Sequence, residues 1–356
     1  MNAISRSPDR TSALVIGATA LLAFLVFANS LANGFAYDDV WIIQNRELVH
    51  GLTHLPELLT TDYWASRFGS GLYRPLTLLT FALDWQMWGG NPFGFHLTNL
   101  LLNSAVTAAA TALLLRFFPW WAALLGGAVF AVHPLHTEAV ANVVGRAELL
   151  TALFILGACL VYVAVVRRNG RLGPGSLAAI AALYVLALFS KELGVVLPAL
   201  LLVLDLPELA RRGFSRFGAY ARSRAPLIAI LALILLAYLG IRWRVLGAPL
   251  GGAPDWFFAA DASFRARFFT MARVWPRYLQ LAVLPLDLSS DYSPAVILPV
   301  SGLTPLGALG IGLVAITVVL AVIAFRRRPE FSVAVLWAAV TLLPVSNLVF
   351  VSEIAL

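Results

Sequence analysis

The sequence predicts an all-α protein of the polytopic membrane class, with about 9 to 11 transmembrane helices. Of its 356 residues, 60% are hydrophobic and 12% are charged, and the mean hydropathy is +0.86. Apolar runs of about 20 residues, enough for a helix to cross the hydrocarbon layer, recur along the chain. These observations exclude a water-soluble globule, because soluble domains carry about 25% charged residues. The candidate spans lie near residues 12–32, 94–115, 119–132, 149–166, 176–190, 193–206, 226–241, 304–325 and 332–350.

The charged residues predict the orientation of these spans. Arg6 and Arg10 precede the first span and Asp38 and Asp39 follow it, which places the N-terminus in the cytoplasm under the positive-inside rule. On this topology most acidic residues, all five histidines and the only lysine, Lys191, lie on the far side. We therefore expect any chemistry on the non-cytoplasmic side. The net charge of +7 is then an orientation signal and predicts no nucleic-acid partner.

The first outer loop, residues 33–93, is too long for a plain connector. Two short amphipathic helices are predicted within it, over 53–61 and 75–88. The second has an apolar stripe that includes Leu83 and a polar stripe that includes Asp84. We expect both helices to lie in the interface plane of the membrane.

The other connections predict no soluble domain. A second large outer region covers 243–303 and contains an arginine-rich amphipathic stretch near 265–285. The segment 134–145 is expected to be re-entrant or interfacial. We expect residues 1–356 to form a single transmembrane domain with no soluble repeat domain.

Two adjacent carboxylates, Asp38 and Asp39, open the first outer loop. A carboxylate close to a bilayer is costly unless it faces water, a partner or a site. One of the two is expected to act as a general base toward a hydroxyl nucleophile. The other then orients it or, if a metal takes part, binds a divalent cation such as Mg²⁺ or Mn²⁺. The alternative is a pair of solvated residues that mark the end of the span.

A second polar cluster follows the third candidate span. Pro134 predicts a new helix with His133 near its N-cap, so that His136 and Glu138 lie in or just beyond its first turn. Free backbone N–H groups at such a terminus favour contact with a phosphate or another part of a substrate. Zinc binding and a purely polar capping role stay open, although the spacing matches no common zinc site.

Charged residues also stand where apolar segments meet. Arg146 and Glu148 begin one span, and Lys191 and Glu192 lie between two others. Charges embedded in this way line a cavity or pair with each other. The simpler alternative is that sequence neighbours pair, Glu148 with Arg146 and Glu192 with Lys191. These four residues and Arg74 map to one face of the membrane, and we expect them to bind substrate or donor phosphate in one outer pocket.

Six short strings, taken in order, resemble a known family. They are Phe35-Ala36-Tyr37-Asp38-Asp39, Tyr73-Arg74-Pro75-Leu76-Thr77, Phe95-His96-Leu97-Thr98-Asn99, His133-Pro134-Leu135-His136-Thr137-Glu138, Gly145-Arg146-Ala147-Glu148-Leu149 and Ser190-Lys191-Glu192. Their order and spacing are similar to the membrane region of the transmembrane and tetratricopeptide-repeat (TMTC) protein O-mannosyltransferases and their bacterial relatives. The resemblance implies a GT-C fold, with many spans and an acidic motif in a large first outer loop.

The resemblance also implies an activity, that of an inverting hexosyltransferase. Such an enzyme moves a sugar, here expected to be mannose, from a polyprenyl-phosphate donor to a hydroxyl of a protein acceptor on the non-cytoplasmic side. We expect a bacterial inner membrane rather than the endoplasmic reticulum. Asp38 and Asp39 match the acidic motif of the family. The candidates for stabilising the departing phosphate are Arg74, His136, Arg146 and Lys191. Transfer to a glycan or lipid, a transporter and a noncatalytic membrane scaffold are the alternatives, and clustering of the charges at one surface disfavours the transporter.

Overall fold

The computed structural model describes residues 10–64, 71–212, 217–247, 263–286, 288–289 and 296–348. Every regular element in these residues is helical and none is a strand, which confirms the all-α prediction. Within them, four helices are long and apolar enough to cross a membrane: Pro92–Leu114, Val143–Val166, Gly218–Leu246 and Pro305–Ala324. Shorter apolar helices cover Arg10–Val26, Trp120–Val132, Pro174–Ser190 and Pro329–Val345. The chain is a multi-pass membrane protein.

Each candidate span contains a helix. The α-helices are α1 (Arg10–Val26), α2 (Leu55–Leu58), α3 (Pro75–Trp88), α4 (Pro92–Leu114), α5 (Trp120–Val132), α6 (His136–Ala141), α7 (Arg146–Asn169), α8 (Pro174–Ser190), α9 (Leu197–Arg212), α10 (Phe217–Leu246), α11 (Phe264–Val283), α12 (Pro305–Ala324) and α13 (Pro329–Leu342). Short turns of 3₁₀- or π-helix are η1 (Ala28–Ala32), η2 (Val40–Gln44), η3 (Glu47–Val49), η4 (Val143–Gly145), η5 (Glu192–Val196) and η7 (Leu343–Val345).

The chain divides into two compact units. Unit 1 comprises residues 1–197 and 223–251, and unit 2 comprises residues 198–222 and 252–356. Every residue that the sequence predicted for the site lies in unit 1. The single transmembrane domain over residues 1–356 stays a prediction.

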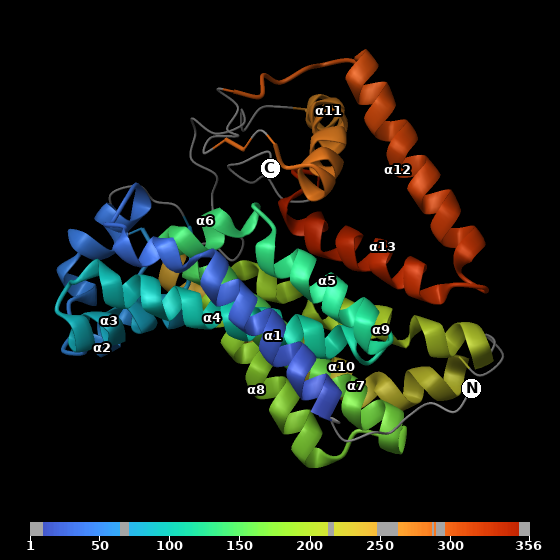
Figure 1. Cartoon of the computed structure of the whole chain (residues 1–356), viewed down its shortest axis with the longest axis horizontal. Coiled ribbons are helices and arrows are strands. Elements are labelled where there is room, and N and C mark those ends of the chain that lie inside the picture. Colours follow the sequence, from blue (N-terminus) through green and yellow to red (C-terminus); the bar gives the residue numbers. More distant parts are fainter. Residues whose placement is uncertain are drawn as a thin grey trace. The chain divides into compact units, whose positions relative to one another are not determined.

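Unit 1 is organised around α4. This helix packs against α1, α5 and α7, and α7 in turn packs against α8; Figure 1 shows α1, α4 and α5 running alongside one another. The amphipathic helix α3 contacts α4, α7 and α8. The first outer loop is therefore held against the helical bundle.

Local sequence signals set the turn between α3 and α4. Pro75 occupies the first turn of α3, as predicted, and Gly89 ends the helix in the left-handed conformation with φ 58°. Asn91 then caps α4, since its side chain accepts a hydrogen bond of 3.1 Å from the backbone N–H of Phe93. The tight turn brings α3 back against α4.

The polar stripe of α3 faces the protein. Thr77, Phe81 and Asp84 are buried, whereas Leu83 and Met87 of the apolar stripe are 41% and 65% exposed. A helix that turns its polar side inward and its apolar side outward suits a membrane environment, where the surroundings are as apolar as a protein core. This orientation places Asp84 within unit 1.

Unit 2 contains α11, α12 and α13, with α12 packed against both others. The predicted amphipathic stretch 265–285 matches α11. The helices approach closely at Gly310, where a Cβ atom would lie 2.0 Å from the carbonyl oxygen of Ala272. Residues 248–262, 287 and 290–295 of the predicted outer region 243–303 lie outside the described residues, as does Arg6.

Candidate functional site

Asp39 is a buried anchor. Its side chain is 1% exposed, Oδ1 accepts the backbone N–H of Val144 at 2.9 Å, and Oδ2 accepts those of Ala36 and Val143 at 3.2 and 3.3 Å. Burial raises the pKa of Asp39 to about 6, and these hydrogen bonds act in the opposite direction. Both oxygens are therefore engaged, and Asp39 ties the start of the first outer loop to the connection between α6 and α7.

This connection is itself held by Asn99 of α4. The Nδ2 group of Asn99 hydrogen-bonds the carbonyl oxygens of Val140, Asn142 and Val143 at 3.2–3.4 Å. Its Oδ1 accepts the Nε–H of Arg146 at 2.8 Å. The backbone N–H groups that bind Asp39 therefore belong to a turn fixed from its other side.

Asp38 differs from its neighbour. Its side chain is half-buried, and its carboxylate makes no hydrogen bond within the described residues. Burial raises the pKa of Asp38, while the nearby charge of Arg74 lowers it. The preceding residue, Tyr37, has a positive φ of 48°, a strained conformation for a non-glycine residue. Asp38 is thus the member of the pair with oxygens open to a substrate.

Arg74 is held on two sides. Its Nε–H donates to Oε2 of Glu192 at 3.0 Å, and its guanidinium lies 4.8 Å from the ring centroid of Tyr63. The backbone N–H of Tyr73 donates to the other oxygen of Glu192 at 3.1 Å. Burial acts to lower the pKa of Arg74, but Glu192, Tyr63 and Glu148 together outweigh it, so the pKa is raised. Arg74 stays a cation, and its two terminal nitrogens make no hydrogen bond in the described part of the chain.

Lys191 forms an ion pair with Glu148, 43 residues earlier. Electrostatic coupling of Glu138 to Glu148, Lys191 and Asp38 places these four residues in one charged cluster. The pairing of sequence neighbours is wrong, because Glu148 pairs with Lys191 and Glu192 pairs with Arg74.

Arg146 lies in the protein core. Its side chain is fully buried and forms a 2.5 Å ion pair with Asp84. It also donates to the carbonyl oxygens of Thr80 and Phe95 at 3.2 and 3.0 Å, and to Asn99. A guanidinium with all three nitrogens engaged and no exposure does not fit the predicted contact with phosphate. We therefore leave Arg146 out of the site.

The histidine cluster differs from its prediction at the N-cap, whereas His136 and Glu138 lie in the first turn of a new helix as predicted. His133 ends α5, and α6 begins only at His136, with Leu135 as its N-cap and a length of six residues. The Nδ1 atom of His133 accepts the N–H of Leu135 at 3.3 Å. Burial lowers the pKa of His136 to about 4, and its ring lies 4.4 Å from that of Phe130. His136 is therefore neutral at pH 7 and supplies no cation.

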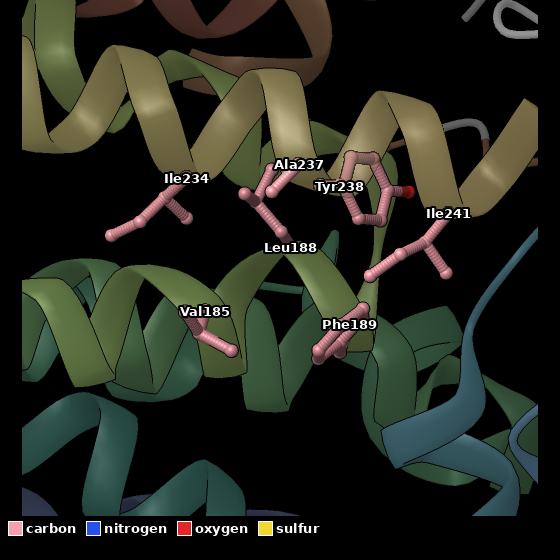
Figure 2. Close-up of a pocket in the computed structure, with 7 residues that line it drawn as sticks. All are labelled: Val185, Leu188, Phe189, Ile234, Ala237, Tyr238 and Ile241. Carbon is pink, nitrogen blue, oxygen red and sulfur yellow. The ribbon is translucent and has the colours of Figure 1, made fainter.

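An apolar groove lies between α8 and α10, with a volume of about 160 Å³. Figure 2 shows the facing side chains that line it: Val185, Leu188 and Phe189 of α8, and Ile234, Ala237, Tyr238 and Ile241 of α10. The rings of Phe189 and Tyr238 also lie 6.0 and 6.2 Å from that of Tyr73, the neighbour of Arg74. The groove therefore extends to Tyr73, the residue directly before Arg74.

Sequence reasoning singled out neither Tyr63 nor Asn99 as a site residue. Asn99 is the last residue of one of the six strings, and membership of that string is the sequence feature that could have marked it as a site residue. Tyr63 stands in the middle of the first outer loop with no flanking pattern that marks it.

Comparison with known proteins finds relatives of one kind. The protein O-mannosyl-transferase F38B6.6 of Caenorhabditis elegans is 28% identical over 342 residues, which cover 92% of this chain and 46% of that protein. Human TMTC4 is 37% identical over 188 residues, covering 48% of this chain and 25% of its own. Drosophila melanogaster Tmtc2 is 38% identical over 229 residues, which cover 61% of this chain and 24% of that protein. These matches confirm the resemblance to the TMTC proteins.

The chain spans less than half the length of each of these relatives. No family model matches the sequence, and no solved structure matches the fold.

Proposed function

We propose that this relative of the TMTC protein O-mannosyl-transferases is a membrane glycosyltransferase that moves mannose from a polyprenyl-phosphate donor to a hydroxyl of a protein acceptor. The names of the relatives support mannose and a protein acceptor. The observation that carries the proposal is that the half-buried carboxylate of Asp38 lies within the electrostatic reach of the Arg74 guanidinium. A carboxylate and a guanidinium, each with unbonded polar atoms within the described residues, suit a substrate with both a hydroxyl and a phosphate.

Asp38 is the proposed general base. It accepts the proton of the acceptor hydroxyl as the hydroxyl oxygen attacks the anomeric carbon of the sugar. The bond between that carbon and the phosphate oxygen breaks on the opposite face, so the configuration inverts and polyprenyl phosphate leaves as an anion. Arg74 stabilises the charge that develops on the phosphate.

The neighbouring residues position this pair. Glu192 fixes the guanidinium of Arg74 through Nε, which leaves the terminal nitrogens for the phosphate. Asp39 holds the backbone of Asp38 against the turn between α6 and α7. Lys191 provides a second cation in the cluster, although its charge is shared with Glu148.

The groove between α8 and α10 supports the proposal that the donor carries a lipid chain. Its lining is apolar, and its aromatic residues reach Tyr73, directly before Arg74. An amphiphile with a phosphate head and a hydrocarbon chain matches this combination of a cation and an apolar channel. The charge distribution of the spans favours a site on the non-cytoplasmic side, with the N-terminus in the cytoplasm.

The two aspartates do not fit a divalent cation as a pair. A carboxylate offers about four lone-pair sites, and three of those on Asp39 accept backbone N–H groups. Its side chain is also only 1% exposed, which leaves little access for a cation shared with Asp38. Among the described residues, no group of three or more His, Cys, Asp or Glu side chains is arranged to bind a metal ion. The proposed mechanism therefore has no step through a metal.

The test is transfer of radiolabelled mannose from polyprenyl-phosphate-mannose by the full chain in lipid vesicles that also contain membrane protein acceptors. We expect labelled protein with the wild type, and a rate lower by roughly 10²–10⁴-fold with Asp38→Asn, the range that general bases contribute. Glu57→Gln is the matched control, because Glu57 is an exposed carboxylate of the same loop.

An inactive wild type, or unchanged transfer by Asp38→Asn, contradicts the proposal. Label found in lipid or glycan in place of protein would identify a different acceptor for the same chemistry.

A further inference from the structure

The hydroxyl of Tyr63 is buried without a partner. The side chain is 2% exposed, and its oxygen makes no hydrogen bond within the residues that the structure describes. A buried hydroxyl has lost its hydrogen bonds to water, so proteins seldom leave one unsatisfied unless it serves a function. Because the hydroxyls of Tyr184 and Tyr238 are also buried without a partner in the described chain, what distinguishes Tyr63 is its surroundings.

The ring of Tyr63 is fixed in place. Its backbone N–H donates to the carbonyl oxygen of Leu72 at 2.8 Å, and its own carbonyl accepts from Nη1 of Arg46 at 2.5 Å. The ring packs in an apolar cluster of the first outer loop that includes Ile43 and Phe81. A side chain held on all these sides does not rotate its hydroxyl into water, so the hydroxyl is pre-organised.

The surroundings of this hydroxyl are those of the proposed site. The strongest charge acting on it is that of Arg74, whose guanidinium covers the ring, and the charges of Glu148, Asp38 and Asp39 also reach it. Burial raises the pKa of Tyr63, so the phenol keeps its proton at neutral pH and can donate a hydrogen bond. Three kinds of unbonded polar group therefore meet: a phenol, the terminal guanidinium nitrogens and one carboxylate.

Of these three groups, an ionised Asp38 can only accept, the guanidinium can only donate, and the protonated phenol can donate as well as accept. A ligand that satisfies all of them presents anionic oxygens to Tyr63 and Arg74 and a hydroxyl proton to Asp38. We propose that the Tyr63 hydroxyl is a further catalytic residue, which donates a hydrogen bond to the same phosphate group that Arg74 binds. This assignment rests on the proposed function. It adds a neutral hydrogen-bond donor, Tyr63, beside the guanidinium of Arg74 at the phosphate.

Tyr63→Phe is the direct test, because it removes the hydroxyl and keeps the ring beneath Arg74. In the vesicle assay we expect kcat to fall by roughly 10²–10³-fold, the effect of losing one donor to a developing oxyanion. Inhibition by the product, polyprenyl phosphate, is expected to weaken at least tenfold. The thermal unfolding midpoint is expected to stay the same or rise, since an unsatisfied buried hydroxyl is removed.

Tyr184→Phe is the matched control, because Tyr184 of α8 is fully buried and its hydroxyl also lacks a partner in the described chain. It is expected to leave kcat and product inhibition unchanged, and its unfolding midpoint is expected to stay the same or rise for the same reason as in Tyr63→Phe. A Tyr63→Phe variant within twofold of the wild type, or one whose lost activity accompanies a lower midpoint, would overturn the assignment. An inactive wild type would instead overturn the proposed function, and the assignment with it.

Discussion

Val144 donates its backbone N–H to Oδ1 of Asp39 at 2.9 Å, across 105 residues of sequence. This hydrogen bond joins the start of the first outer loop to the turn that precedes α7. The two adjacent aspartates therefore have different roles. Asp39 accepts backbone hydrogen bonds that stabilise the fold, whereas the carboxylate of Asp38 makes no hydrogen bond within the described residues.

Asp39→Asn is expected to destabilise the protein. In the wild type both carboxylate oxygens accept backbone N–H groups. Asparagine has one acceptor oxygen, so its NH₂ group would face a backbone N–H, and two donors cannot bond each other. We expect a loss of about 1–3 kcal/mol in the free energy of unfolding. Asp38→Asn is the control and is expected to change it by less than about 0.5 kcal/mol. Thermal unfolding of both variants measures the difference, and equal midpoints contradict the anchoring role of Asp39.

The transfer rate is expected to fall as the pH is lowered, with a midpoint above 3.8, the ordinary pKa of an aspartate. Asp38 is a base only when ionised, and burial raises its pKa above the ordinary 3.8. For Asp39 the pKa is about 6 in the folded protein against 3.8 in the unfolded chain. Proton uptake by Asp39 between these values favours folding, and this contribution is lost as the pH rises through 6. Titration of Asp39 therefore does not unfold the protein on the acid side.

Initial rates and tryptophan fluorescence, recorded at the same pH values, test this expectation. A rate that falls while the fluorescence keeps its folded value agrees with titration of the site. A rate that stays constant down to pH 3.8, the ordinary pKa of an aspartate, contradicts it.

Arg146→Met is expected to destabilise the core. Removing the guanidinium leaves the carboxylate of Asp84 buried without its ion partner, which typically costs about 3–5 kcal/mol. The double variant with Asp84→Asn removes both charges and is expected to recover part of this loss. Thermal unfolding of the three proteins measures the effect. A stable Arg146→Met variant with weakened donor binding would instead restore Arg146 to the site.

Gly145→Ala is expected to disturb the turn that binds Asp39. A Cβ atom at this position would lie 2.5 Å from the carbonyl oxygen of Glu138, so the backbone must shift. The neighbouring N–H groups of Val143 and Val144 then move away from Asp39, and we expect both the transfer rate and the unfolding midpoint to fall. Gly175→Ala is the control, because nothing lies within 4 Å of its Cβ position. Equal behaviour of the two variants excludes a special role for this glycine.

Much of the helical architecture was predictable because it depends on local properties. Apolar runs long enough to cross a bilayer, proline at first turns and glycine at helix ends mark segments such as α3 and α4 without knowledge of their neighbours. The histidine cluster was harder, since Pro134 follows His133 but the chain starts α6 only at His136. A proline near a helix start permits several registers, and packing selects one of them.

The sequence by itself determined that this chain is a helical membrane protein and that Asp38 and Asp39 open a long loop. Only the tertiary structure decided which charges meet. Arg146 was predicted to be a site residue, but it forms a buried ion pair with Asp84 in the core. Glu192 forms an ion pair with Arg74 and not with its sequence neighbour Lys191. Ion pairs form between groups that helix packing brings together, and residues adjacent in sequence point in different directions around a helix.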